Sequence, residues 1–288
     1  MSALFICRDV VFKTEKGIAV MRSPVESLFP GICIHVSAIS AWSAVLNYEE
    51  RFKQKGSLSR LFCSVNMLNE NDYKLSEGER AIIFAGNMES VIQSADVKNI
   101  KQVTLVFIPV IQEKHFYCVC FNLKDYKIEV LDNSATNVSF EAKYQQWPEK
   151  LRDAFSSYLE SASHPAASIL RETVPIRLEM PWRTTRNVID CGVFLMRHME
   201  TYKGTSLKKW ECGLSKECNN AGEISYKQRK ELDELRYKYA AKIILSDVNQ
   251  VRPFAEADVA RYKKLSEDQR KRLDAVAYDT ILARLDSN

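Results

Sequence analysis

Cys191 lies at a point in the sequence where a thiol can act as a nucleophile. A polar turn ends at Asp190, Cys191 and Gly192 follow, and an apolar pattern with helical spacing begins at once. The first turn of a helix has unpaired backbone N–H groups and the positive end of the helix dipole, and both favour a thiolate. A cysteine nucleophile also needs a general base and a group that orients that base.

The chain has four histidines that could be this base. His198 follows Cys191 by two helical turns, roughly 10 Å by helix rise, which is too far for proton transfer. His35 precedes an apolar helical pattern, and His164 lies in a sequence typical of a surface loop. His115 opens a predicted strand just after a polar turn, at the rim of the sheet. We therefore predict that His115 is the base.

A predicted hairpin brings His115 close to a carboxylate. Its first strand starts at His115 and its second ends at Asp132, where a carboxylate has no packing role. If Leu123 and Lys124 are the two turn residues, His115 faces Asp132, and facing Cβ atoms lie about 4.5–5.5 Å apart. A slip of two residues in the loop leaves the pair diagonal and still within reach. Either residue alone is commonplace at a strand end, but the match between them predicts a Cys-His-Asp arrangement.

The composition is that of an ordinary globular protein with a sizeable core. Of 288 residues, 46% are hydrophobic and 27% charged, and the net charge of +4 is too small to predict nucleic-acid binding. Eight scattered cysteines favour free thiols and a reducing compartment. No apolar run approaches the roughly 18 residues of a membrane span. We therefore expect a protein of the nucleus or cytoplasm with no membrane partner.

The cysteine spacing does not predict a metal site. Cys118 and Cys120 alternate on one face of a strand, and Cys212 and Cys218 lack the compact paired spacing of a zinc site. The basic residues near Lys263 and Arg270 have acidic neighbours and are typical of a solvated helix face. We expect no cofactor and no metal.

The remaining patterns predict an α+β fold in which helices flank a small, mixed central sheet. Three Ser-x-x-Glu/Gln capping boxes, at Ser23, Ser225 and Ser266, mark helix starts. The last residues, 251–288, are expected to form a C-terminal helical extension. Predicted strands cover 4–13, 18–21, 102–111, 115–123, 127–132 and 174–179, and further predicted helices cover 37–52 and 146–161.

Motifs around His115, Asp132 and Cys191 resemble those of the SUMO/ubiquitin-like-protein-specific cysteine proteases. The chain order and the helix after the cysteine are also similar to that family. The matching segments are His115-Phe116, Leu131-Asp132-Asn133-Ser134 and Asp190-Cys191-Gly192-Val193-Phe194. Residues 38–47, 196–202 and 235–241 are similar to its plant, transposon-associated branch.

This resemblance implies a papain/adenain-like fold over residues 1–250 and cleavage after the C-terminal Gly-Gly of a ubiquitin-like modifier. The implied partner is a precursor or conjugate of a ubiquitin-like protein of the SUMO type. Cys191 would be the nucleophile, His115 the general base and then acid, and Asp132 the group that orients it. The backbone N–H of Cys191 would be one oxyanion donor, which is often worth about 3 kcal/mol of barrier.

The resemblance also implies substrate-binding residues, and here the chain departs from the family pattern. Phe116 replaces the tryptophan that helps to form the Gly-Gly tunnel, while Gly192 is kept. Thr185 stands where the family has its oxyanion glutamine, so the donor is Thr185, Arg183 or Arg186, or the oxyanion site is weak. Cys33-Ile-His-Val36 replaces the family's Trp-Leu-Asn-Asp, which removes the second tunnel wall.

Two other functions remain open on the sequence alone. The departures at Thr185 and at residues 33–36 would fit an inactive module that binds a ubiquitin-like protein without cleaving it. A Cys-His pair can also carry out acyl transfer, as in related bacterial effectors, although the sequence gives no specific reason to expect an acetyl donor.

Overall fold

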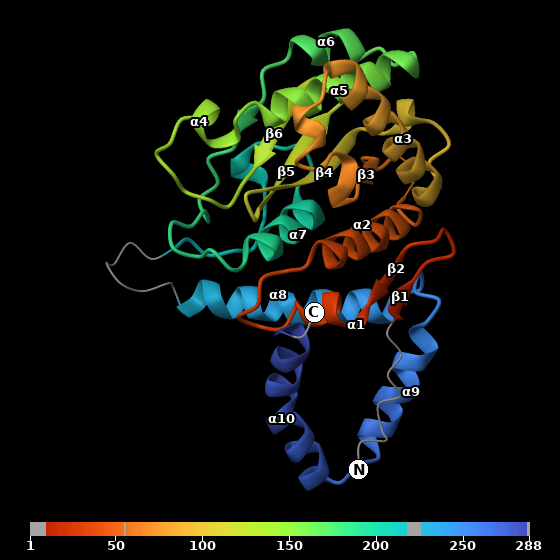
Figure 1. Cartoon of the computed structure of the whole chain (residues 1–288), viewed down its shortest axis with the longest axis vertical. Helices are drawn as coiled ribbons and strands as arrows, with labels where there is room; N and C mark the ends of the chain where they lie inside the picture. The colour runs from red at the N-terminus through yellow and green to blue at the C-terminus, as the bar shows by residue number, and fades with distance from the viewer. Residues whose placement is uncertain (1–9, 55, 218–225, 287–288) are drawn as a thin grey trace.

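The computed structural model of the chain describes residues 10–54, 56–217 and 226–286, and its centre is a mixed sheet of five strands (Figure 1). The strand order is β3-β4-β5-β6-β7, with parallel pairs at both edges and antiparallel pairs in the middle. A separate hairpin pairs β1 with β2. The strands are β1 (Val10–Lys13), β2 (Ala19–Met21), β3 (Arg60–Phe62), β4 (Leu105–Gln112), β5 (His115–Asn122), β6 (Lys127–Leu131) and β7 (Ile176–Arg177). The predicted α+β fold with a mixed central sheet is confirmed.

Helices cover both faces of the sheet (Figure 1). One face carries α3, α5 and α6, and the other carries α2 and α7, with α8 packed beneath these two. The helices are α1 (Arg22–Glu26), α2 (Val36–Glu50), α3 (Glu77–Ala95), α4 (Phe140–Tyr144), α5 (Trp147–Ser161), α6 (Ala167–Glu172), α7 (Cys191–Thr201), α8 (Tyr226–Leu245), α9 (Arg252–Lys263) and α10 (Glu267–Asp286).

The sheet divides the core into two hydrophobic clusters. Successive side chains of a strand point to opposite faces, so Phe107 packs toward α2, α7 and α8 while Val106 packs toward α3, α5 and α6. Both faces of β4 and β5 are covered, which explains why the sequence of β4 is an almost continuous apolar run. Cys191 belongs to the first cluster, and the N-terminus of α7 is thus anchored in the core.

The predicted capping boxes have three different outcomes. Ser266 and Gln269 exchange the two expected hydrogen bonds at the start of α10, which confirms that box. Ser225 lies outside the described residues, as do residues 4–9 of the first predicted strand. The box at Ser23 is wrong: the N-cap of α1 is Met21, without a side-chain cap, because the helix follows β2 directly.

The hairpin of β5 and β6 is confirmed, but its predicted register is wrong by two residues. Cys118 pairs with Leu131 and Asn122 pairs with Lys127, so the loop has four residues instead of two. Asn122 holds this loop, because its side-chain oxygen accepts from the backbone N–H groups of Lys124 and Asp125. His115 is therefore placed diagonally to the residue after β6 rather than opposite to it.

The longest element that the sequence patterns did not predict is α3. It begins with a complete capping box, in which Ser76 accepts from the backbone N–H of Glu79 and the Glu79 side chain accepts from the backbone of Ser76. The same Ser-x-x-Glu signal was recognised elsewhere in the chain, so this helix could have been found by it. Helices α4 and α6 and strand β3, each six residues or shorter, also went unpredicted.

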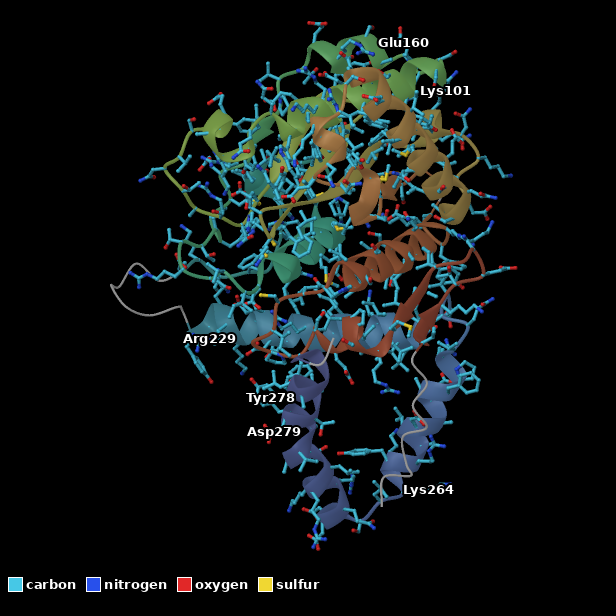
Figure 2. The ribbon with its side chains drawn as sticks, in the orientation of Figure 1. Lys101, Glu160, Arg229, Lys264, Tyr278 and Asp279 are labelled. Carbon is cyan, nitrogen blue, oxygen red and sulfur yellow. The ribbon has the colours of Figure 1, made fainter. Side chains whose placement is uncertain are left out.

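Helices α9 and α10 extend away from the sheet and meet near Lys264 (Figure 2). Along α9, and along α10 as far as Ala283, the structure describes no buried residue. The attachment of α10 is local: Tyr278 packs on Phe29, with the two rings tilted by 41° and their centroids 5.4 Å apart. None of the described helices is long and apolar enough to cross a membrane.

Candidate active site

A tight turn between β4 and β5 places His115 at the rim of the sheet. Glu113 and Lys114 form a two-residue turn with φ angles of 49° and 65°, and Gln112 pairs with His115 across it. Asp132 is the first residue after β6. The His115 Nε2 lies 2.7 Å from Asp132 Oδ1, so the diagonal arrangement brings the predicted pair into contact.

Asp132 is fully buried and both of its carboxylate oxygens are occupied. Oδ1 accepts from His115 Nε2 and from the backbone N–H of Ser134 at 2.8 Å. Oδ2 accepts from the Tyr144 hydroxyl at 2.8 Å and lies 2.8 Å from Lys143 Nζ. Burial by itself raises the pKa of Asp132, but the hydrogen bond and charge of His115 and the charge of Lys143 hold that pKa well below its usual range. Asp132 is therefore an anion that orients the imidazole.

The opposing influences on His115 leave it a strong base. Burial lowers its pKa, but hydrogen bonds to Asp132 and to the thiol of Cys191 and the negative charges of both groups raise the pKa to about 9. Because an ionised carboxylate can only accept, Nε2 carries the proton toward Asp132. The other ring nitrogen, Nδ1, is then the one available to the thiol of Cys191.

Cys191 is the first residue of α7, as the sequence predicted. The helix is fixed to α2 by a hydrogen bond from the Trp42 indole to the carbonyl of Met196. Gly192 is needed for close packing, since a Cβ at this position would lie 2.6 Å from Cβ of Ile34. Ile34 belongs to residues 33–36, the segment that replaces the family's Trp-Leu-Asn-Asp. This segment therefore packs against the start of α7.

The predicted oxyanion residue, Thr185, is bound to a different partner. Its backbone N–H and its hydroxyl both donate to Glu217 Oε2 at 2.8 Å, and the backbone N–H of Arg186 donates to Glu217 Oε1 at 3.2 Å. A threonine hydroxyl can donate one hydrogen bond, and that of Thr185 donates to Glu217. Of the two alternatives, Arg183 is bound to Glu179 and to the Met180 carbonyl.

The remaining predicted residues differ in how the structure places them. Phe116 is only 5% exposed and packs in the same hydrophobic cluster as Cys191. His164 is buried, contrary to the surface loop predicted for it, because its Nδ1 accepts from the backbone N–H of Ala166. His198 is fully buried and accepts from the Trp182 indole at 3.0 Å, so it is not a base for Cys191.

Several residues around the site were missed by sequence reasoning. Lys143 and Tyr144 come from the unpredicted helix α4, which Ser139 caps by accepting from the backbone of Ala142. Ser139 was therefore the sequence signal from which α4 could have been predicted. Glu217 gave none, because the groups that it accepts from belong to Thr185 and Arg186, which precede it by 32 and 31 residues. Among the described residues, no group of three or more His, Cys, Asp or Glu side chains could hold a metal ion.

The family model of the Ulp1 protease family, C-terminal catalytic domain, matches residues 58–242 of the chain. The chain belongs to the Ulp1 protease family. It is therefore a cysteine protease domain, and the match contains His115, Asp132 and Cys191. The comparison with curated proteins gives no match.

Solved structures of Ulp1-type domains share the fold of this family member. The SUMO protease Ulp1 with its catalytic cysteine oxidised to a sulfenic acid is 12% identical, with a TM-score of 0.56 over 84% of this chain and 90% of that one. The C-terminal Ulp1 protease domain in complex with Smt3, the yeast ortholog of SUMO, is 13% identical, with a TM-score of 0.56 over 83% and 89%. The Chaetomium thermophilum Ulp1-like SUMO protease catalytic domain is 14% identical, with a TM-score of 0.51 over 88% of both chains. At these identities the likeness establishes the fold.

Proposed function

We propose that this Ulp1-family domain is a peptidase or isopeptidase that cleaves after the C-terminal Gly-Gly of a SUMO-type modifier. Cys191 is the nucleophile, His115 the general base and acid, and Asp132 the residue that orients it. The observation that carries the proposal is the contact of His115 with both Asp132 and the thiol of Cys191. The SUMO-type partner is supported by the similar Ulp1 domain that was solved in complex with Smt3.

The proposed reaction passes through a thioester. His115 Nδ1 takes the thiol proton, and the thiolate of Cys191 attacks the carbonyl carbon of the terminal glycine. As the C–N bond breaks, the leaving amine takes the proton from His115. Water then attacks the thioester, His115 removes a proton from that water, and Cys191 leaves with the proton returned. The backbone N–H of Cys191 stabilises the oxyanion in both steps.

The test is cleavage of reporters fused to SUMO, Nedd8 or ubiquitin, together with vinyl-sulfone or propargyl probes of the same modifiers. We expect the SUMO probe to form a covalent adduct with the wild type. The Cys191→Ala variant is expected to lose activity by at least about 10⁴-fold while its thermal unfolding is unchanged. If the wild type forms no adduct with any of these probes, the proposed peptidase activity is rejected.

A second candidate function is binding of the modifier without turnover. It is favoured by the capture of the Thr185 hydroxyl by Glu217, which leaves one fewer donor for an oxyanion. This function predicts a stable complex with the modifier and no processed product. A mixture of the protein with a SUMO precursor, analysed by gel filtration and by mass, distinguishes the two.

We further propose a catalytic unit of residues 1–250 and a C-terminal extension of residues 251–288. The family match ends at residue 242, and α9 has no buried residue. Membership of the plant, transposon-associated branch and a location in the nucleus or cytoplasm are also proposals. They are supported by the sequence motifs at 38–47, 196–202 and 235–241 and by the composition.

A further inference from the structure

An ion pair between a buried arginine and a partly buried aspartate lies next to the nucleophile in the sequence. Asp190, the residue before Cys191, accepts at Oδ1 from Arg236 Nε at 2.8 Å and Nη2 at 2.5 Å. Its Oδ2 accepts from the Asn187 side chain at 2.7 Å. Arg236 belongs to α8, more than 40 residues further along the chain, and none of its surface is exposed. Such a guanidinium is costly to bury, so its contacts must be nearly complete.

Arg236 also contacts the segment that covers the start of α7. Its Nη1 donates to the carbonyls of Ser27 and Phe29 at 3.2 and 3.1 Å. The Ser27 hydroxyl in turn accepts from the backbone N–H of His35, which closes the loop that carries Ile34 onto Gly192. One side chain thus joins the residue before the nucleophile to the loop above it.

The negative charge of Asp190 opposes the formation of a thiolate on the adjacent residue, Cys191. A thiolate beside an unpaired carboxylate is disfavoured by like-charge repulsion, whereas a paired carboxylate is electrically almost neutral. Other charged groups near the pair are Asp233 and Arg229 of α8, and Arg229 is labelled in Figure 2. From β5 the imidazole of His115 faces Cys191, with Asp132 and Lys143 behind it.

We propose that Arg236 is a positioning residue for Cys191, which neutralises Asp190 and holds the turn from which the thiol projects. This rests on the proposed function of Cys191 as the nucleophile. The ion pair gives α8 a role in the reaction, although α8 supplies no group that touches the reacting atoms.

The test measures the rate of alkylation by iodoacetamide as a function of pH, with the rate of the Cys191→Ala variant subtracted to remove the other thiols. In Arg236→Gln we expect the midpoint of this profile to move upward by about half a pH unit or more, because Asp190 is left unpaired. In Asp190→Asn we expect it to move downward. The double variant is expected to return close to the wild-type midpoint, and Arg236→Lys to show a smaller upward movement than Arg236→Gln.

Opposite signs for the two single variants separate this role from a purely structural one, which would slow alkylation in both. Movement in the same direction, or no movement in folded variants, overturns the proposal. If Arg236→Gln does not fold, Asp190→Asn still decides, because it keeps the guanidinium and must lower the midpoint. The readout needs no SUMO substrate, so a failure to cleave SUMO would reject the proposed function and leave this inference standing.

Discussion

The two sides of the candidate site are built in different ways. On the base side, Asp132 is fully buried and its two oxygens have four partners. On the oxyanion side, Thr185 and Arg186 are exposed, and their backbone donors and the threonine hydroxyl all turn to one carboxylate, that of Glu217.

This difference means that the base side tolerates little change, whereas the oxyanion side can be altered. A buried network with every position occupied has one arrangement, and each lost member leaves an uncompensated polar group. A contact between exposed residues and a partly exposed carboxylate contributes little to stability and competes with water. Substitutions on the base side should therefore reduce activity, whereas a suitable substitution on the oxyanion side should increase it.

Among substitutions that compare the two sides, the largest effect is expected for Asp132→Asn. Loss of the carboxylate leaves His115 in the wrong tautomer, and kcat should fall by about 10³–10⁴-fold. The pKa of His115, about 9, is raised by Asp132, and the imidazolium must donate to the leaving amine. The alkaline limb of kcat/KM therefore lies near pH 9 in the wild type and should move to lower pH in the variant. An unchanged limb would mean that another group controls it.

The second prediction concerns how the free energy of unfolding depends on pH through His198, which lies near Asp132. Burial lowers the pKa of His198 to about 3, so between that value and the unfolded value of about 6.5 only the unfolded chain binds this proton. Stability is thus lost as the pH falls through this range, by about 2 kcal/mol between pH 6.5 and pH 5. Urea unfolding at both pH values should show this loss, and His198→Gln, which keeps an acceptor for Trp182, should remove most of it. An equal loss in both proteins would contradict the assignment.

On the oxyanion side, Thr185→Gln should raise kcat by roughly tenfold, because a longer amide can donate to the oxyanion beyond the reach of Glu217. The measurement is single-turnover cleavage of a SUMO reporter, with Thr185→Asn as the shorter amide control. A fall in kcat for Thr185→Val comparable to the loss of an oxyanion donor would show that the threonine hydroxyl already acts there, and the two sides would then be equally fixed.

The smallest effect is expected for Tyr144→Phe. It removes one of the four partners of Asp132 and leaves the others, which costs about 1 kcal/mol and lowers kcat about fivefold. The control is Phe140→Leu, also on α4, which makes no contact with Asp132 that the structure records. An effect as large as that of Asp132→Asn would mean that Tyr144, rather than the carboxylate, sets the orientation of His115.

Local patterns in the sequence determined much of this protein. The continuous apolar run of β4, the hairpin after it and the helix that begins at Cys191 each depend on residues close together in the chain. The contact between His115 and Asp132 was predictable for the same reason, although the four-residue loop held by Asn122 shifted the register by two. Helix α3 went unpredicted although Ser76 begins a capping box and its buried residues, from Phe84 to Ala95, recur at helical spacing.

Only the tertiary structure decided the partners that lie far apart in sequence. The polar atoms of Thr185 bind Glu217, and Asp190 binds Arg236, because the second half of the chain folds back over the turn before Cys191. No periodicity relates such residues: Arg236 is placed by the packing of α8 on α7, and Glu217 by the segment between these two helices. The sequence alone could therefore predict the contact of His115 with Asp132 and the position of Cys191 at the start of α7, on which the proposed roles of these residues rest. Which groups hold the turn before the thiol, and in which direction Thr185 donates its proton, depended on the packing of the whole chain.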